Sequence, residues 1–271
     1  YIWTDNHTEA INAADIADSF FPDSGNLKIR RAEILIIDDK NEEALEILNH
    51  LERIELNNAY INFTKAKAYI GLNNMLEANQ QFELSLCKEP ENSVELLLQF
   101  AEYLTNIALF ETALKFLKRA YDNNSNHVDV LYQTAHCYDR LNDWDNSIIF
   151  YNKYLDEDPF DEGVWHNLGT IYGRRNQNEK AIEAFNFALT VNDSYEPALY
   201  NKANTLANME KYNEAIETFK TFLKLEPDNL YAQCTIGECY EKLGQYDTAC
   251  EYYYKVIETD SNFADAHYGL S

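Results

Sequence analysis

The 271-residue sequence predicts an all-α fold, a solenoid in which antiparallel helix pairs stack one on the next. A 34-residue pattern recurs along the chain, and small and large residues hold fixed positions within it. Only 5 Pro and 8 Gly are present, too few for the turns of a many-stranded β-sandwich, whereas helices joined by short loops need few of either.

The repeat is clearest where two segments are compared directly. The segment LYNKANTLANMEKYNEAIETFKTFLKLEP from Leu199 aligns without a gap with WHNLGTIYGRRNQNEKAIEAFNFALTVND from Trp165. Extending this register, with one extra residue near Ser93, predicts seven units: 25–58, 59–93, 94–127, 128–161, 162–195, 196–229 and 230–263.

The two ends of the chain continue the same register. Residues 1–24 fit the second helix of an eighth unit, with Ala10 at a small position and Pro22 at the terminator. Residues 264–271 fit the start of a further unit. Because neither end offers a polar capping helix, we expect an internal fragment of a longer array.

Two positions of the repeat carry only small residues. The eighth is Ala32, Ala66, Ala101, Ala135, Gly169, Ala203 and Gly237, and the twentieth is Ala44, Ala78, Ala113, Ser147, Ala181, Ala215 and Ala249. Small residues are needed where two antiparallel helices cross at closest approach, since a larger side chain would push the helices apart. These columns therefore predict the crossing points of each pair.

Large residues fill two complementary positions. The eleventh is Leu35, Tyr69, Leu104, Tyr138, Tyr172, Leu206 and Tyr240, and the twenty-fourth is Leu48, Phe82, Leu117, Tyr151, Phe185, Phe219 and Tyr253. This spacing predicts a first helix (A) and a second helix (B) of about 14 residues each in every unit. Proline at the thirty-second position ends the second helix, as Pro90, Pro159 and Pro227.

The pattern resembles the tetratricopeptide repeat (TPR) family over nearly the whole chain. Unit 162–195 carries the family signature most fully, as Trp165, Leu168, Gly169, Tyr172, Ala181, Phe185 and Ala188. The sequence departs from it at the fourth position (Lys28, Asn62, Gln233) and at the twenty-seventh (Leu51, Tyr154, Phe222), where we expect altered local packing. The resemblance implies a right-handed superhelical solenoid whose A helices line the concave side.

Charge narrows the choice of partner. The formal net charge is −24, from 46 acidic and 22 basic residues, so nucleic acid and anionic membranes would be repelled over most of the surface. Such a surface suits either solubility of an elongated molecule or a basic partner. No apolar stretch reaches the roughly 20 residues that span a bilayer. Five cysteines without a CxxC pair indicate free thiols, and we expect a cytoplasmic protein.

In the TPR family the second, fifth, sixth, ninth, twelfth and thirteenth positions face the groove. The sixth position carries an amide in four consecutive units, as Gln99, Gln133, Asn167 and Asn201. An amide both donates and accepts, so this row is suited to pair with the backbone of an extended peptide. It resembles the asparagine ladder in the repeat arm of O-linked N-acetylglucosamine transferases. The alternative is that these are ordinary polar residues on a solvent-facing helix.

Aromatic and cationic side chains flank the predicted amide row. Tyr132, His166 and Tyr200 hold the fifth position, Asn204 the ninth, and Arg140 and Arg174 the thirteenth. Aromatic anchors beside cations suit a peptide with acidic or aromatic residues. The N-terminal groove is more apolar and suits a partner helix or the N-terminal segment, unless its residues are inter-repeat core: Ile29, Ile36, Ile37, Phe63, Ile70 and Leu98.

The sequence offers little for catalysis. There is no HExxH, no Cys/His cluster with zinc spacing and no glycine-rich phosphate loop, so we expect neither an enzyme, a metal nor a cofactor. Cys137 and Cys239 occupy a packing position, whereas Cys234 is expected on the groove as the thiol to test for reactivity. The second position lacks a cation, which argues against binding of chaperone tails.

The expected function is therefore a protein–protein interaction scaffold that binds an extended peptide or a partner helix in the concave groove. The alternative is the substrate-recruiting arm of a larger enzyme whose catalytic domain lies outside this sequence. Self-association through the uncapped ends is a third hypothesis.

Overall fold

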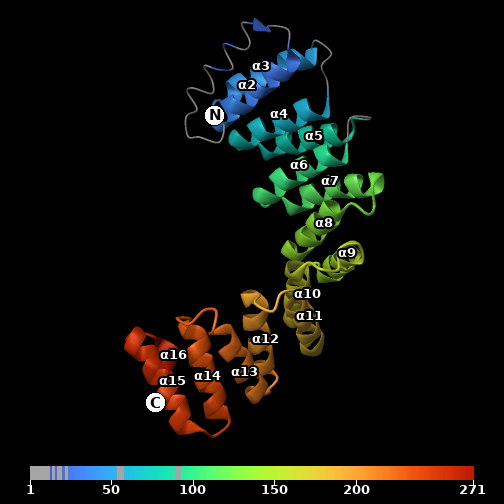
Figure 1. Cartoon of the computed structure of the whole chain (residues 1–271). Helices are drawn as coiled ribbons and strands as arrows, with labels where there is room; N and C mark the ends of the chain where they lie inside the picture. The colour runs from blue at the N-terminus through green and yellow to red at the C-terminus, as the bar shows by residue number, and fades with distance from the viewer. Residues whose placement is uncertain (1–12, 14–15, 17–19, 22–23, 54–57, 89–92) are drawn as a thin grey trace. The chain divides into compact units, whose positions relative to one another are not determined.

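The computed structural model describes residues 24–53, 58–88 and 93–271, together with residues 13, 16, 20 and 21 (Figure 1). Within these ranges the chain forms helices and no strands, so the predicted all-α array of helix pairs is confirmed. The half unit expected in residues 1–24, with Ala10 and Pro22, lies outside the described residues, as does Pro90.

Fifteen helices are found among the described residues. They are α2 (Gly25–Ile37), α3 (Asn41–Arg53), α4 (Ala59–Gly71), α5 (Met75–Leu86), α6 (Val94–Asn106), α7 (Phe110–Asn123), α8 (Val128–Arg140), α9 (Trp144–Glu157), α10 (Glu162–Arg174), α11 (Asn178–Val191), α12 (Glu196–Asn208), α13 (Tyr212–Phe222), α14 (Leu230–Lys242), α15 (Tyr246–Thr259) and α16 (Ala264–Gly269).

The chain divides into two compact units, each of which contains several repeats. The first unit is Tyr1–Cys137 and the second unit is Tyr138–Ser271, with the boundary inside α8. In the first unit α2 pairs with α3, α4 with α5 and α6 with α7. In the second unit α10 pairs with α11, α12 with α13 and α14 with α15. Within a unit the second helix of one pair also packs on the first helix of the next, as α11 does on α12.

Each hairpin turns through one residue in the left-handed region, at the fifteenth position of the repeat. These residues are Asp39, Asn73, Ala108, Asn142, Asn176, Glu210 and Gly244, with φ between 55° and 73°. The amide of the following residue donates to the carbonyl of the eleventh position, as Gln177 does to Tyr172 at 2.9 Å. This is the Schellman arrangement that closes a helix C-terminus.

The small residues of the eighth and twentieth positions lie where the two helices of a pair meet. All fourteen of these residues are buried. Contact is tight at the two glycines, because a Cβ on Gly169 would lie 2.5 Å from the Phe185 ring and one on Gly237 would lie 2.7 Å from the Tyr253 ring. The eighth position of helix A therefore receives the large side chain at the twenty-fourth position of helix B.

The departures from the family pattern are accommodated locally. At the fourth position Trp165 Nε1 donates to the carbonyl of Pro159 at 3.0 Å, and Gln233 Nε2 makes the equivalent bond to Pro227 at 2.7 Å. A side-chain amide thus replaces the indole N–H. At the twenty-seventh position Tyr154 reaches out of the core, and its hydroxyl donates to Asp161 at 2.9 Å.

The core of the first unit is rich in aromatic residues. The Phe63 ring stacks on Phe100 with centroids 3.8 Å apart, and Phe116 packs edge-on against both at 5.7 Å. Such pairs stabilise a core beyond the area that they bury. This cluster fixes helices α4, α6 and α7, and with them Tyr60 and Lys67 of α4, which pack on the Phe100 and Phe63 rings.

Candidate binding surfaces

Two of the predicted ladder amides, Asn167 and Asn201, lie on α10 and α12 and are partly exposed. The Asn201 amide nitrogen lies 2.8 Å from His166 Nε2, and Asn167 Nδ2 donates to the Tyr151 hydroxyl at 3.4 Å. Burial lowers the pKa of His166, so its ring is neutral at pH 7 and Nε2 accepts the bond from Asn201. These bonds orient both amides.

The His166 ring is held in place by two aromatic neighbours. Phe185 lies 5.8 Å from it and Tyr195 packs edge-on at 5.7 Å, centroid to centroid. Because Asn201 is bonded to this fixed ring, its carbonyl oxygen and second N–H are presented in a defined direction. The arrangement is a positioned amide rather than a freely rotating surface side chain.

Two glycines of α10 differ in the space around them. Gly163 precedes Asn167 by one helical turn, and a Cβ there would lie 3.2 Å from Asp161 Oδ1. Gly173 follows His166 by two turns. A Cβ on Gly173 would meet no other atom within 4 Å. The backbone of α10 is therefore open to close approach by another chain at this point.

Tyr200 and Asn204 follow one another on α12. The Tyr200 ring packs on Phe219 at 5.9 Å and on Phe222 at 5.3 Å, so it is anchored on the core while remaining partly exposed. Asn204 is partly exposed one turn further along the same helix. Together with Asn201 they give α12 an aromatic and two amides on neighbouring positions.

The predicted cations are engaged within the protein. Arg174 Nη1 bonds to Asp139 Oδ1 at 2.9 Å, and the adjacent Arg175 pairs with Asp145. Arg140 is exposed near the end of α8 and also has a partner inside the chain. The thirteenth position therefore carries paired charges, and exposed pairs of this kind contribute little stability.

The other two ladder amides belong to the first unit. Gln99 is exposed on α6, and Gln133 on α8 is partly buried, with an Oε1 atom that finds no hydrogen-bond partner in the structure. Tyr132 is 38% exposed and its ring stacks on His136 at 6.4 Å. Alignment of all four amides in one ladder stays a prediction, because they are divided between the two units.

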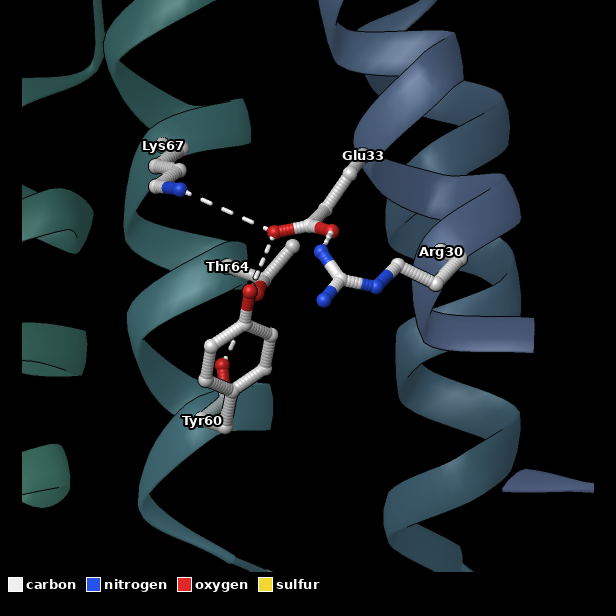
Figure 2. A network of polar contacts seen from close by, with 5 residues as sticks. All are labelled: Arg30, Glu33, Tyr60, Thr64 and Lys67. Atoms are coloured by element: carbon white, nitrogen blue, oxygen red, sulfur yellow. Dashed lines mark hydrogen bonds and ion pairs between the residues drawn. The ribbon is translucent and has the colours of Figure 1, made fainter. Parts of the chain in front are cut away.

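A polar network on α2 and α4 was not predicted. In Figure 2 the Glu33 carboxylate lies between Arg30, Tyr60 and Lys67. It accepts hydrogen bonds from Arg30 Nη1 at 2.8 Å and the Tyr60 hydroxyl at 2.6 Å, and forms an ion pair with Lys67 Nζ at 3.8 Å. Burial and the bond to Glu33 raise the pKa of Tyr60 to about 12, and burial lowers the pKa of Lys67. One sequence feature could have indicated this network: Glu33 and Lys67 carry opposite charges and share the ninth position in consecutive repeats.

Two hollows flank this network. One of about 330 Å³ is lined by Arg30, Glu33, Ile36, Ile37, Lys67 and Tyr103, and one of about 340 Å³ by Asn26, Ile29, Arg30 and Tyr60. Of the apolar residues predicted here, Ile29 and Phe63 are buried in the core, whereas Ile37 is 49% exposed at the first hollow. The N-terminal residues thus serve partly as core and partly as open surface.

The expectation that Cys234 is an accessible thiol is wrong. Cys234 is 2% exposed, and burial, with Glu238 and Asp265 nearby, raises its pKa to about 12. It packs in a cluster with Tyr253 and Ala266, so α16 covers it. Cys137 and Cys239 are buried as expected, and Cys87 is exposed.

The described residues hold no group of three or more His, Cys, Asp or Glu side chains arranged to bind a metal ion. Nor does any helix among them have the length and apolar character needed to cross a bilayer.

The helix pairs, the small crossing positions and the open A-helix residues define a helical-repeat protein. Residues 101–162 and 200–267 match one family model described as tetratricopeptide repeat, and residues 150–183 match a second with the same description. The chain belongs to the tetratricopeptide repeat family. The more specific likeness to the repeat arm of O-linked N-acetylglucosamine transferases stays a prediction.

Solved structures agree on the fold. The chain is similar to the C-terminal part of a TPR repeat-containing protein from Cytophaga hutchinsonii (19% identity, 90% of this chain, 99% of that chain, TM-score 0.65). It is also similar to YrrB, described as a TPR protein with an unusual peptide-binding site (20% identity, 70% of this chain, 97% of that chain, TM-score 0.61). A third similar structure is that of the MamA protein (22% identity, 63% of this chain, 93% of that chain, TM-score 0.59). No curated protein matches the sequence.

Proposed function

We propose that this protein is a protein–protein interaction scaffold that binds an extended peptide or a partner helix on the face formed by its A helices. Support comes from the fold, an array of packed helix pairs that holds surface side chains in fixed places. The structural likeness to YrrB, described as having a peptide-binding site, is consistent with such a role.

The observation that carries the proposal is the pair of oriented amides on α10 and α12, together with the open backbone at Gly173, two turns along α10 from His166. The bond from Asn201 to His166 fixes one amide, and Gly173 has empty space around its Cβ position. A peptide backbone needs donors and acceptors at fixed places and room to come close, and this surface offers both. Tyr200 adds an anchored aromatic ring for a peptide side chain.

The amide proposal is tested by selecting binders from a display library of amidated peptides and measuring their affinity. Replacing Asn167 and Asn201 with Ala removes up to two hydrogen bonds to the peptide, which costs about 1–3 kcal/mol, or roughly ten- to hundredfold in Kd. Loss of the intramolecular bonds is checked by thermal unfolding of the same variant.

A matched control exists on the B helices. Asn152 on α9 and Asn186 on α11 are both exposed, so the double Ala variant removes the same two amides from another face. We expect it to bind as tightly as the unmodified protein. If the two double variants bind selected peptides equally well, the A-helix amides are not the peptide site.

A further inference from the structure

The hollow of about 330 Å³ beside α2, α4 and α6 has a charge balance unlike the rest of the chain. It is lined by Arg30, Glu33, Ile36, Ile37, Lys67 and Tyr103. The chain has 46 acidic and 22 basic residues, yet two of these six are cations and one is an anion. The hollow therefore carries a net positive charge within an acidic protein.

The single carboxylate in this hollow is already well supplied with donors. Glu33 is only 12% exposed at its side chain. One oxygen accepts from Arg30, and the other accepts from Tyr60 and lies near Lys67 (Figure 2). A ligand cation would have to compete with these groups for Glu33, so a positively charged occupant is disfavoured.

The Lys67 ammonium is poorly satisfied by comparison. Its side chain is 21% exposed, and its contact with Glu33 at 3.8 Å is too long for a hydrogen bond. Beyond this, it lies over the rings of Tyr103 at 4.7 Å and Phe63 at 5.3 Å. Among the described residues the Lys67 ammonium makes an ion pair and two ring contacts but no hydrogen bond, so it can donate to an acceptor placed in the hollow that it lines.

Part of the lining is apolar. Ile36 and Ile37 at the end of α2 both line the hollow, and Ile37 leaves 49% of its surface exposed. An occupant that matches the whole lining carries an acceptor for Lys67 and an apolar group for the isoleucines.

We propose that this hollow binds an acidic side chain, Glu or Asp, flanked by an apolar residue within an internal segment of a partner protein. The carboxylate of the partner accepts hydrogen bonds from the Lys67 ammonium and from guanidinium N–H groups of Arg30 that do not bond to Glu33. The apolar neighbour packs on Ile36 and Ile37. The inference rests on the proposed function, because it assigns a partner chemistry to the A-helix face of the first unit.

Three labelled peptides test the chemistry directly: acetyl-Ala-Leu-Glu-Leu-Ala-amide and its counterparts with Gln or Lys at the centre. Blocked termini exclude capture of a terminal carboxylate. We expect fluorescence anisotropy at low salt to give the Glu peptide about tenfold or more tighter binding than the Gln peptide, with the Lys peptide weakest. Equal binding of all three, tighter binding of the Lys peptide, or no binding at all would overturn the inference.

Two variants with opposite expected effects separate binding from folding. Lys67→Met keeps the apolar stem and removes the charge, and should weaken binding of the Glu peptide about tenfold. Glu33→Gln removes the repelling carboxylate and should strengthen it about threefold, a gain that mere damage to the fold does not produce. Weaker binding by Glu33→Gln would contradict the proposal.

Lys115→Met is the matched control for lost charge. Lys115 lies on α7 in the same unit, pairs with Glu83 and does not line the hollow. It should leave the affinity of the Glu peptide unchanged. If Lys67→Met behaves like this control while the Asn167/Asn201 variant still loses its selected peptides, the present inference fails and the proposed function stands.

Discussion

Gly169 lies so close to Phe185 that a methyl group in place of its hydrogen would stand 2.5 Å from Cε1 of the ring. Phe185 is 2% exposed and has little room to move away. The contact explains why one helix of each pair needs a small residue where the other has a large one, and it sets the separation of α10 and α11.

Replacing Gly169 with Ala should therefore destabilise the protein, despite the better helix propensity of Ala. We expect a loss of about 1–3 kcal/mol through overpacking, and a larger loss for Gly169→Leu. Gly173→Ala is the control on the same helix. With no atom within 4 Å of its Cβ position, it should gain about 0.5–1 kcal/mol. Urea unfolding of both variants measures the difference, and a neutral Gly169→Ala would disprove the assigned contact.

Substitutions at two of the left-handed turn residues, Glu210 and Gly244, should change the stability of the protein in opposite directions. Glu210 has φ of 61°, which is unfavourable for a residue with a side chain, whereas Gly244 occupies the equivalent turn at 73°. Glu210→Gly should stabilise by up to about 1 kcal/mol, and Gly244→Ala should destabilise by about 1 kcal/mol or more. Thermal unfolding measures both, and a shift of the same sign in the two variants would be inconsistent with the turn geometry.

Tyr60→Phe removes the donor that lies 2.6 Å from Glu33. At pH 7 we expect a loss of about 1–2 kcal/mol, since the bond is to a charged group in a partly buried place. The pKa of Tyr60 is raised in the folded state to about 12, above the value of about 10 for free tyrosine. Its stabilising effect is thus complete below pH 10 and lost as the pH approaches 12.

The stability difference between the unmodified protein and Tyr60→Phe, measured by urea unfolding at several pH values, should therefore shrink above pH 10. A difference that stays constant from pH 7 to pH 12 would show that the Tyr60 hydroxyl is not linked to Glu33.

Reactivity toward a thiol reagent should distinguish the exposed Cys87 from the buried Cys234. Cys87 is exposed and should react with Ellman's reagent at pH 8 in the folded protein. Cys234 should not, because it is buried and a pKa of about 12 leaves about one thiolate in ten thousand at that pH. Mass spectrometry of partly labelled protein locates the modified residues. Labelling of Cys234 at the rate of Cys87 would contradict its place beneath α16.

The sequence was sufficient to predict the repeat because sterics restrict the crossing positions. Ala181 and Phe185 can be exchanged for few other residues without moving two helices, so their spacing marks the fold directly. The hairpin turn was not predicted, because residues such as Ala108 and Glu210 occupy a conformation that their side chains disfavour, and tertiary packing enforces it.

The binding surfaces were less predictable than the fold. The network around Glu33 depends on how α2 and α4 are placed side by side, and a single repeat read alone does not reveal it (Figure 2). Cys234 occupies a groove position in the pattern, but the packing of Ala266 on α16 buries it. The position of a residue in the repeat indicates which face of the helix it lies on, whereas the packing of neighbouring helices determines whether its side chain is accessible.

The most direct test of the interaction-scaffold proposal is to find which face touches a selected peptide. A photo-reactive benzoylphenylalanine fits at position 173 on α10, where Gly173 has open space, and at position 186 on α11, where Asn186 is exposed. After irradiation with a labelled peptide, we predict cross-linking from position 173 and none from position 186. Cross-linking from position 186 alone would contradict binding on the A-helix face.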